Sequence, residues 1–201
     1  MRFIGITGGV GAGKSAILSY LAEKPMTKVM LADEIAHDLM EPGTECYKQI
    51  VEQFAGLDIV TDSGVFDRVK LAQVIFSDDK RREQMNGIVH PAVKEFVQNQ
   101  YALEKEKNEL ELLVLEAALL IEEDYGEICD ELWYIYTSEE NRRKRLKESR
   151  GYTDEKIDNI FKSQLSETEF RVSTQVTIDN NGDLEETMKQ IEKALRRKAD
   201  E

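Results

Sequence analysis

Short apolar runs alternate with segments of helical periodicity along this chain. Arg2–Thr7, Lys28–Leu31, Leu112–Leu115 and Leu132–Tyr136 are each a few residues long and rich in aliphatic or aromatic side chains, and Val176–Ile178 is a weaker run. Short apolar strands that alternate with helices are typical of a parallel sheet covered on both faces. The pattern therefore predicts an α/β fold with a five-stranded parallel sheet flanked by helices.

Helical segments follow several of these runs. Lys14–Glu23 carries apolar residues at helical spacing directly after the first run. Thr137 with Glu140, and Asp183 with Glu186, have the spacing of capping boxes. These pairs predict helix starts after the fourth strand and at the last helix.

A long insertion separates the second and third strands. Residues 43–109 are too many for one crossover helix, and 70–76 and 92–106 have helical character. We expect a helical insertion that faces the substrate, within a single domain spanning 1–201. The pair His90-Pro91 predicts a break or restart of the helix, because proline suits a first helical turn better than an interior.

Composition narrows the classes of function. The 201 residues carry a formal net charge of −13, whereas general nucleic-acid binders are usually basic. Cys46 and Cys129 lack the spacing of a metal site, so we expect two reduced core thiols. No apolar run approaches the roughly 20 residues of a membrane span, and the N-terminal run is too short for a signal peptide. We expect a cytoplasmic protein, monomeric or weakly self-associating, with no nucleic-acid or membrane partner.

A glycine-rich stretch carries the first chemical signal. Residues 8–15 read GGVGAGKS, a full G-x-x-x-x-G-K-[ST] match between a predicted strand and a predicted helix. In such a loop the backbone N–H groups surround phosphates, the lysine reaches the β- and γ-phosphates, and the serine hydroxyl binds Mg²⁺. The alternative is a glycine-rich turn without a ligand. The predicted nucleotide contacts are Gly9, Val10, Gly11, Ala12, Gly13, Lys14, Ser15 and Ala16.

The phosphate loop alone does not fix the reaction. The N-K-x-D motif with which a GTPase reads its base is missing from the sequence, and motor or transport ATPases are normally larger. A small kinase that transfers a phosphoryl group fits best.

Further motifs follow in order along the chain. The segments are Ile6–Ser15, Leu31–His37, Phe66–Arg68, Leu71, Ile75–Ser77, Ile88–Val93, Glu116–Glu122 and Ile178–Gly182. On these segments the sequence resembles dephospho-CoA kinases from Ile4 to Gly182. It departs from that family at Leu31, Ala118 and Gln175, where the family has Asp, Pro and often an acid. The resemblance implies a P-loop kinase fold and transfer of the γ-phosphate of ATP to the ribose 3′-hydroxyl of dephospho-CoA, the last step of coenzyme A synthesis, with Mg²⁺.

Four residues are candidates for the acceptor side. Asp33 follows the second strand, and ligands of open α/β sheets gather at the carboxyl ends of strands. Its carboxylate could take the proton of the attacking hydroxyl or hold the metal through water, or it could cap the following helix. His37 lies one turn further on and either contacts substrate or orders Asp33. Arg68 and His90 are substrate contacts by the resemblance, and helix-start residues in the alternative.

Glu116 and a basic cluster complete the prediction. Glu116 ends the third strand, where an acid would reach Mg²⁺ through water, or would simply face solvent. Six basic residues and one acid lie between 142 and 150, within a predicted lid of residues 139–165. Such lids stabilise charge on the transferred phosphoryl group, and Arg145 aligns with the family's lid arginine. Arg142 and Arg150 stay open for that role, and the cluster could instead be a solvated helix face.

Two rival functions stay open. A different small-molecule or nucleoside kinase would use the same scaffold with another acceptor. A regulatory protein that binds ATP without catalysis would keep the loop and have no use for a basic lid.

Overall fold

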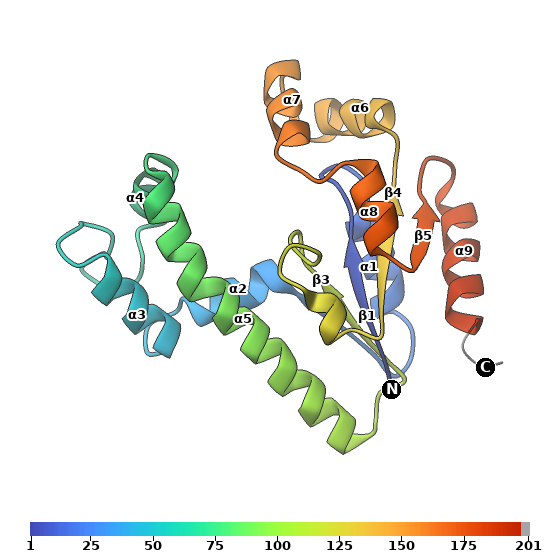
Figure 1. The fold of residues 1–201 in the computed structure, drawn as a ribbon, viewed down its shortest axis with the longest axis horizontal. Helices are drawn as coiled ribbons and strands as arrows, with labels where there is room; N and C mark the ends of the chain where they lie inside the picture. Colours follow the sequence, from blue (N-terminus) through green and yellow to red (C-terminus); the bar gives the residue numbers. More distant parts are fainter. Residues whose placement is uncertain (198–201) are drawn as a thin grey trace. The chain divides into compact units, whose positions relative to one another are not determined.

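The computed structural model describes residues 1–197 and confirms the predicted sheet (Figure 1). β1 pairs in parallel with β3 and with β4, and β4 pairs in parallel with β5. The order β2-β3-β1-β4-β5 places β1 at the centre, so the loop after β1 begins at the carboxyl edge of the sheet. The strands are β1 (Arg2–Thr7), β2 (Thr27–Leu31), β3 (Leu112–Glu116), β4 (Glu131–Tyr136) and β5 (Val176–Asp179).

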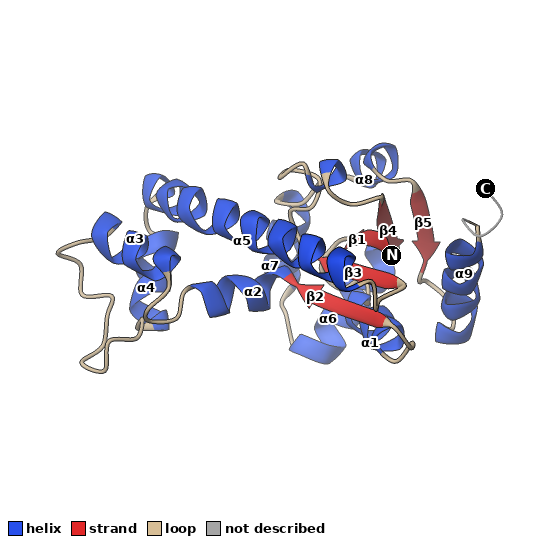
Figure 2. Cartoon of the chain, turned by 90° about the horizontal axis from the view of Figure 1, so that it is seen from below, coloured by secondary structure: helices blue, strands red, loops and turns tan. Residues whose placement is uncertain are grey.

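The described residues form two compact units, one made of residues 1–30 and 107–197, the other of residues 31–106. The first unit holds most of the sheet, whose side chains are buried on both faces, as at Phe3 and Trp133. Figure 2 shows α8 (Glu167–Ser173) on one face and α1 (Lys14–Ala22) on the other. Because helices cover both faces of the sheet, side chains on both sides of each strand are buried, and the sequence of each strand is a nearly continuous apolar run.

Two helices of the first unit follow β4 and lie next to each other in Figure 1, α6 (Glu139–Arg150) and α7 (Asp154–Lys162). The predicted capping box at Thr137 is wrong, because Ser138 is the N-cap of α6 and accepts from the Asn141 N–H at 3.4 Å. The hydroxyl of Thr137 is buried and donates to the carbonyl of Ala12 at 3.0 Å. A tertiary hydrogen bond therefore takes the side chain that the local pattern assigned to the cap.

The last described helix is α9 (Leu184–Arg196), which lies beside β5. Asp183 is its N-cap, as predicted, but its side chain makes no capping hydrogen bond, so the capping box itself is wrong. Arg2 donates to the carbonyls of Ala194 and Leu195 near the other end of the helix. The first strand and the last helix are thereby joined.

The second unit is helical, as predicted for this region. It contains α2 (Ala32–Leu39), α3 (Glu45–Gln53), α4 (Arg68–Phe76) and most of α5 (Asp79–Lys107). The predicted break at Pro91 is wrong, since α5 continues through it. Proline removes one hydrogen bond, but Val89, Val93 and Val97 form a buried apolar row across it. Tertiary packing of that row outweighs the local preference.

Both cysteines are free and buried, as expected for core thiols. Burial raises the pKa of Cys46 and raises that of Cys129 to about 12. Among residues 1–197, no helix is both long and apolar enough to cross a membrane.

Candidate active site

The phosphate loop joins β1 to α1 at the centre of the sheet. Ala12 donates from its backbone N–H to the Gly9 carbonyl at 3.0 Å, which curls the loop. Gly13 ends it in a left-handed conformation, with φ of 86°, which glycine adopts at little cost. Ser15 and Ala16 stand exposed in the first turn of α1, where helix N–H groups lack partners. The strand–loop–helix context predicted for the motif is confirmed.

Lys14 and Glu116 lie beside this loop. The ammonium of Lys14 donates to the Gly8 carbonyl at 2.7 Å, and its Nζ is 3.4 Å from Oε1 of Glu116. Their side chains are about one-sixth exposed, at 16% and 17%. Glu116 therefore faces the loop lysine rather than open solvent, which argues against the solvent-facing alternative.

Asn180 connects the loop to the lid helix and to β5, although the sequence did not single it out. Its side-chain Nδ2 donates to the backbone carbonyl of Ala12 at 2.7 Å. Its backbone carbonyl accepts from Nη2 of Arg145, also at 2.7 Å. Asn180 is buried, and its Oδ1 accepts from the Thr187 hydroxyl at 2.9 Å. A Cβ on Gly13 would lie 2.4 Å from Nδ2 of Asn180, so this position requires glycine for space as well as for φ.

Arg145 lies against the loop by a second contact. Its Nη1 donates to the Ala12 carbonyl at 3.2 Å. The guanidinium therefore stands at the Ala12 end of the loop, next to the turn after β5. The sequence marked Arg145 by its place in the basic cluster and by its alignment with the family, and the structure adds the loop contact.

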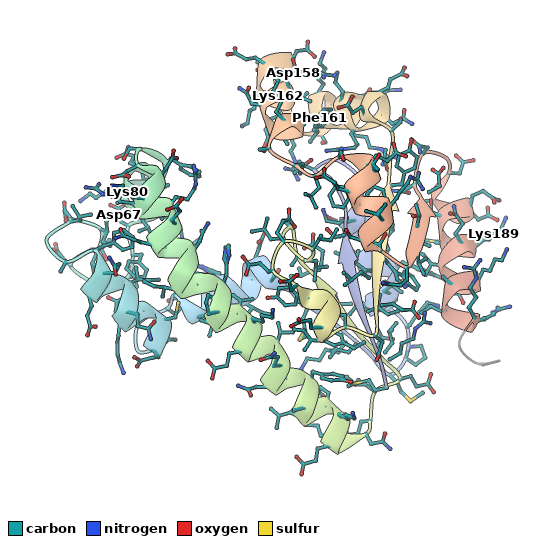
Figure 3. The ribbon with its side chains drawn as sticks, viewed as in Figure 1. Asp67, Lys80, Asp158, Phe161, Lys162 and Lys189 are labelled. Atoms are coloured by element: carbon teal, nitrogen blue, oxygen red, sulfur yellow. The ribbon has the colours of Figure 1, made fainter. Side chains whose placement is uncertain are left out.

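Arg142 lies against the tip of the loop, at Val10. Its Nε donates to the Val10 carbonyl at 2.9 Å and its Nη2 to Oε1 of Gln164 at 2.5 Å. Its guanidinium carbon is 4.3 Å from the centre of the Phe161 ring, and Figure 3 shows Phe161 on the side of α7 toward α6. Burial lowers the pKa of Arg142. The sequence gave no signal for Gln164 or Phe161.

The rest of the basic cluster is partly a solvated, ion-paired face. Arg143 contacts Asp154 at 3.0 Å and Asp158 at 2.5 Å, and Lys147 contacts Asp154 at 2.7 Å. These pairs join α6 to α7, and the hydrogen bonds from Lys147 and from Arg143 lower the pKa of Asp154. Arg150 stands near the ring of Tyr152, 5.9 Å from its centre. Of the candidate lid arginines, Arg142 and Arg145 contact the phosphate loop.

In the second unit, α2 carries Asp33 and His37 on one face, four residues apart. The alternative that Asp33 caps this helix is wrong: Leu31 is the N-cap, and Asp33 lies within the first turn. An acid there is favoured by the helix dipole. Its exposed carboxylate remains available to a ligand.

Arg68 and His37 meet in this unit. Nη2 of Arg68 donates to Nε2 of His37 at 2.5 Å, since a guanidinium has no lone pair to accept with. Asp67 is the N-cap of α4, accepting from two backbone N–H groups, so Arg68 is also a helix-start residue (Figure 3). A cavity of about 260 Å³ adjoins the pair and is lined by His37, Met40, Glu41, Pro42, Val65, Phe66, Arg68 and Leu71.

His90 lies within α5 rather than at a helix start, which overturns that alternative. It is half-buried, and it does not line the cavity of His37 and Arg68. The structure thus gathers Lys14, Glu116, Arg142 and Arg145 around the phosphate loop in one unit. It gathers His37 and Arg68 at a cavity in the other.

The donor set fits Mg²⁺ better than a metal held entirely by protein. Within residues 1–197, no group of three or more His, Cys, Asp or Glu side chains is placed to hold a metal ion. Mg²⁺ is usually bound by one or two protein oxygens together with phosphates and water. The hydroxyl of Ser15, which follows Lys14 in the chain, and the carboxylate of Glu116, which contacts Lys14, are oxygens of this kind.

Comparisons with known proteins agree with these observations. A family model described as dephospho-CoA kinase matches residues 2–186. The chain is 36% identical over 198 residues to a dephospho-CoA kinase of Shouchella clausii, covering 98% of this chain and 99% of that one.

Solved structures share the fold. A protein from Thermus thermophilus matches with a TM-score of 0.73 and 27% identity, covering 98% of this chain and 97% of that chain. A dephospho-CoA kinase from Campylobacter jejuni matches with a TM-score of 0.69 and 18% identity, covering 98% and 96% of the two chains.

Proposed function

Because this chain belongs to the dephospho-CoA kinase family, we propose how its residues divide the transfer of a phosphoryl group from ATP to dephospho-CoA. The evidence for this reaction is the family match over residues 2–186. The assignment of roles rests on the groups that surround the phosphate loop. The rival functions are not favoured, because the family and its named relatives are kinases of this one acceptor.

The phosphate loop binds the triphosphate of ATP. The backbone N–H groups of the loop face the phosphates, apart from those of Val10 and Ala12, which are bonded to Gln164 and Gly9. The ammonium of Lys14 leaves Glu116 to contact the β- and γ-phosphates. Ser15 and Glu116 hold Mg²⁺, which neutralises charge on the phosphates when bound. The Lys14–Glu116 pair at 3.4 Å supports this role, because it keeps both groups at the loop before the nucleotide arrives.

Arg145 serves the nucleotide from the lid. Its contacts with the carbonyls of Ala12 and Asn180 hold the guanidinium beside the loop. A cation fixed there stabilises the charge that develops during phosphoryl transfer, and it needs little reorganisation to do so.

The acceptor is handled by the second unit. Asp33 accepts a hydrogen bond from the ribose 3′-hydroxyl and takes its proton as the new oxygen–phosphorus bond forms. The bond between the γ-phosphorus and the β–γ bridging oxygen breaks in the same transfer, and ADP leaves. His37 and Arg68 contact the rest of the acceptor from the cavity that they line, and His90 contributes from α5. The exposed carboxylate of Asp33, on the same helix face as His37, supports this division.

The experiment compares Asp33→Asn with Asp38→Asn, an exposed aspartate on the same helix. Loss of a general base lowers kcat by about 10²–10⁴-fold. We expect that loss for Asp33→Asn with an unchanged KM for ATP, and full activity for Asp38→Asn. Wild-type activity in Asp33→Asn would remove its role as the base.

A further inference from the structure

The lid holds the tip of the phosphate loop through a closed ring of hydrogen bonds. The Val10 carbonyl accepts from Nε of Arg142 at 2.9 Å, and the Val10 N–H donates to Oε1 of Gln164 at 3.3 Å. Arg142 and Gln164 also bond to each other, at 2.5 Å. Both backbone polar groups of one loop residue are thus bound by lid side chains.

The guanidinium of Arg142 is also packed between two surfaces. One is the ring of Phe161, 4.3 Å from its centre to the guanidinium carbon. The other is Gly9, where an added Cβ would lie 2.3 Å from that carbon. The φ of Gly9 is not in the left-handed region, unlike that of Gly8, Gly11 and Gly13. Glycine is therefore required at position 9 by the approach of Arg142 rather than by backbone conformation.

This packing separates Arg142 from its neighbours on α6. Arg143 is paired with the carboxylates of α7. Arg142 instead donates to a backbone carbonyl and an amide, both neutral, and is buried enough that its pKa is lowered. A charged group is costly to bury for neutral partners, so the arrangement points to a requirement at the loop.

We propose that Arg142 and Gln164 are positioning residues that hold the loop tip in its ATP-binding shape. A glycine-rich loop has many accessible conformations, and ordering it on binding costs free energy. The ring of hydrogen bonds orders residues 9 and 10 beforehand, so the affinity for ATP depends on the lid. The inference rests on the proposed binding of ATP by this loop.

The test measures the dissociation constant of Mg-ATP by calorimetry and the steady-state constants of the kinase reaction. Removing a charge-assisted hydrogen bond weakens binding by about tenfold or more. In Arg142→Ala we expect Kd and KM for ATP to rise about tenfold, with kcat within about threefold of wild type and KM for dephospho-CoA unchanged. Arg143→Ala, on the adjacent residue, is the matched control and should bind ATP like wild type.

Two variants of Gln164 separate positioning from general stability. In Gln164→Glu the carboxylate still accepts from both Arg142 and the Val10 N–H, so the affinity for ATP is retained. In Gln164→Leu the apolar side chain accepts from neither, so Kd for ATP rises as in Arg142→Ala. Hydrogen exchange of the Val10 amide should be slow in wild type and in Gln164→Glu, and faster in Gln164→Leu.

Three outcomes overturn the inference. The first is wild-type affinity for ATP in Arg142→Ala, and the second is an equal loss in Arg143→Ala. The third is a fall of about 10²-fold or more in kcat, which would place Arg142 on the transferred phosphoryl group. Failure of the wild type to bind Mg-ATP at all would instead contradict the proposed function, so the two failures are distinguishable.

Discussion

Lys14 and Glu116 form an ion pair beside the phosphate loop, with 3.4 Å between Nζ and Oε1. The lysine is also bound to the Gly8 carbonyl at 2.7 Å. A lone ammonium in a partly buried site would be costly, and this pair offsets that cost before the nucleotide binds. In the proposed function, Lys14 would exchange this carboxylate for a phosphate of the nucleotide, and Glu116 would then be available to Mg²⁺.

Glu116→Gln should therefore weaken the response to Mg²⁺ more than the response to ATP. An amide is a poorer ligand for a hard cation than a carboxylate. We expect the Mg²⁺ concentration for half-maximal activity to rise about tenfold. Replacing a residue that supports a metal site from its outer shell typically lowers metal affinity by about that factor. The control is Glu111→Gln, on an exposed residue just before the same strand. An unchanged Mg²⁺ titration in Glu116→Gln would exclude Glu116 from the metal site.

Arg145→Ala should reduce the rate of phosphoryl transfer. Its guanidinium bridges the Ala12 and Asn180 carbonyls, and a lost donor of transition-state charge typically lowers kcat by about 10²–10³-fold. Lys144→Ala, on the exposed neighbour in α6, should leave kcat near the wild-type value. Comparable kcat values for the two variants would show that Arg145 has only a structural part.

Glycine to alanine substitutions should have opposite effects at two positions. At Gly87, inside α5, an added Cβ meets nothing within 4 Å, and alanine stabilises a helix interior by about 0.5–1 kcal/mol. At Gly9 the Cβ would overlap Arg142, so ATP binding should weaken. Urea denaturation and ATP calorimetry measure the two effects. A destabilised Gly87→Ala or an unaffected Gly9→Ala would contradict the packing described.

One pH dependence follows from the contact of α9 with Tyr20 of α1 and with Lys24, just after that helix. Lys24 and Tyr20 both donate to Glu192, and the Lys24 hydrogen bond above all lowers the pKa of that carboxyl. A lowered folded pKa stabilises the fold above the ordinary carboxyl value of about 4.3 and loses that effect as pH falls below it.

Glu192→Gln should therefore lower the free energy of unfolding at pH 7 by about 1 kcal/mol or less, since the pair is partly exposed. The difference from wild type should shrink as the pH falls below about 4. Glu185→Gln, on an exposed residue of the same helix, is the control. A difference that stays constant between pH 7 and pH 3.5 would show that ionisation of Glu192 does not contribute.

Local patterns predicted the strands, the phosphate loop and most helices, because each depends on residues close in sequence. They failed at Pro91, where the buried valines of α5 decide the outcome. They also failed at Thr137, whose hydroxyl bonds to Ala12, far away in the chain. A capping pattern contains no information about such a partner.

The candidate site divides in the same way. Lys14 and Ser15 could be predicted because the motif fixes their place, and Arg145 because it aligns with a family. Gln164 could not, since its link to Val10 joins residues 154 positions apart. Asn180 lies within Ile178–Gly182, a segment that resembles the family. The sequence does not distinguish it from the adjacent Asn181, whereas its contacts with Ala12 and Arg145 in the structure do.

Release of ADP from ATP, measured with dephospho-CoA and with CoA as alternative acceptors, tests the central assignment most directly. CoA already carries the 3′-phosphate, so it offers no hydroxyl at the reacting position. We expect ADP release that requires dephospho-CoA and Mg²⁺, that is absent with CoA, and that falls by about 10²-fold or more in Lys14→Met. ADP release that is equal with the two acceptors, or that proceeds without either, would contradict the account.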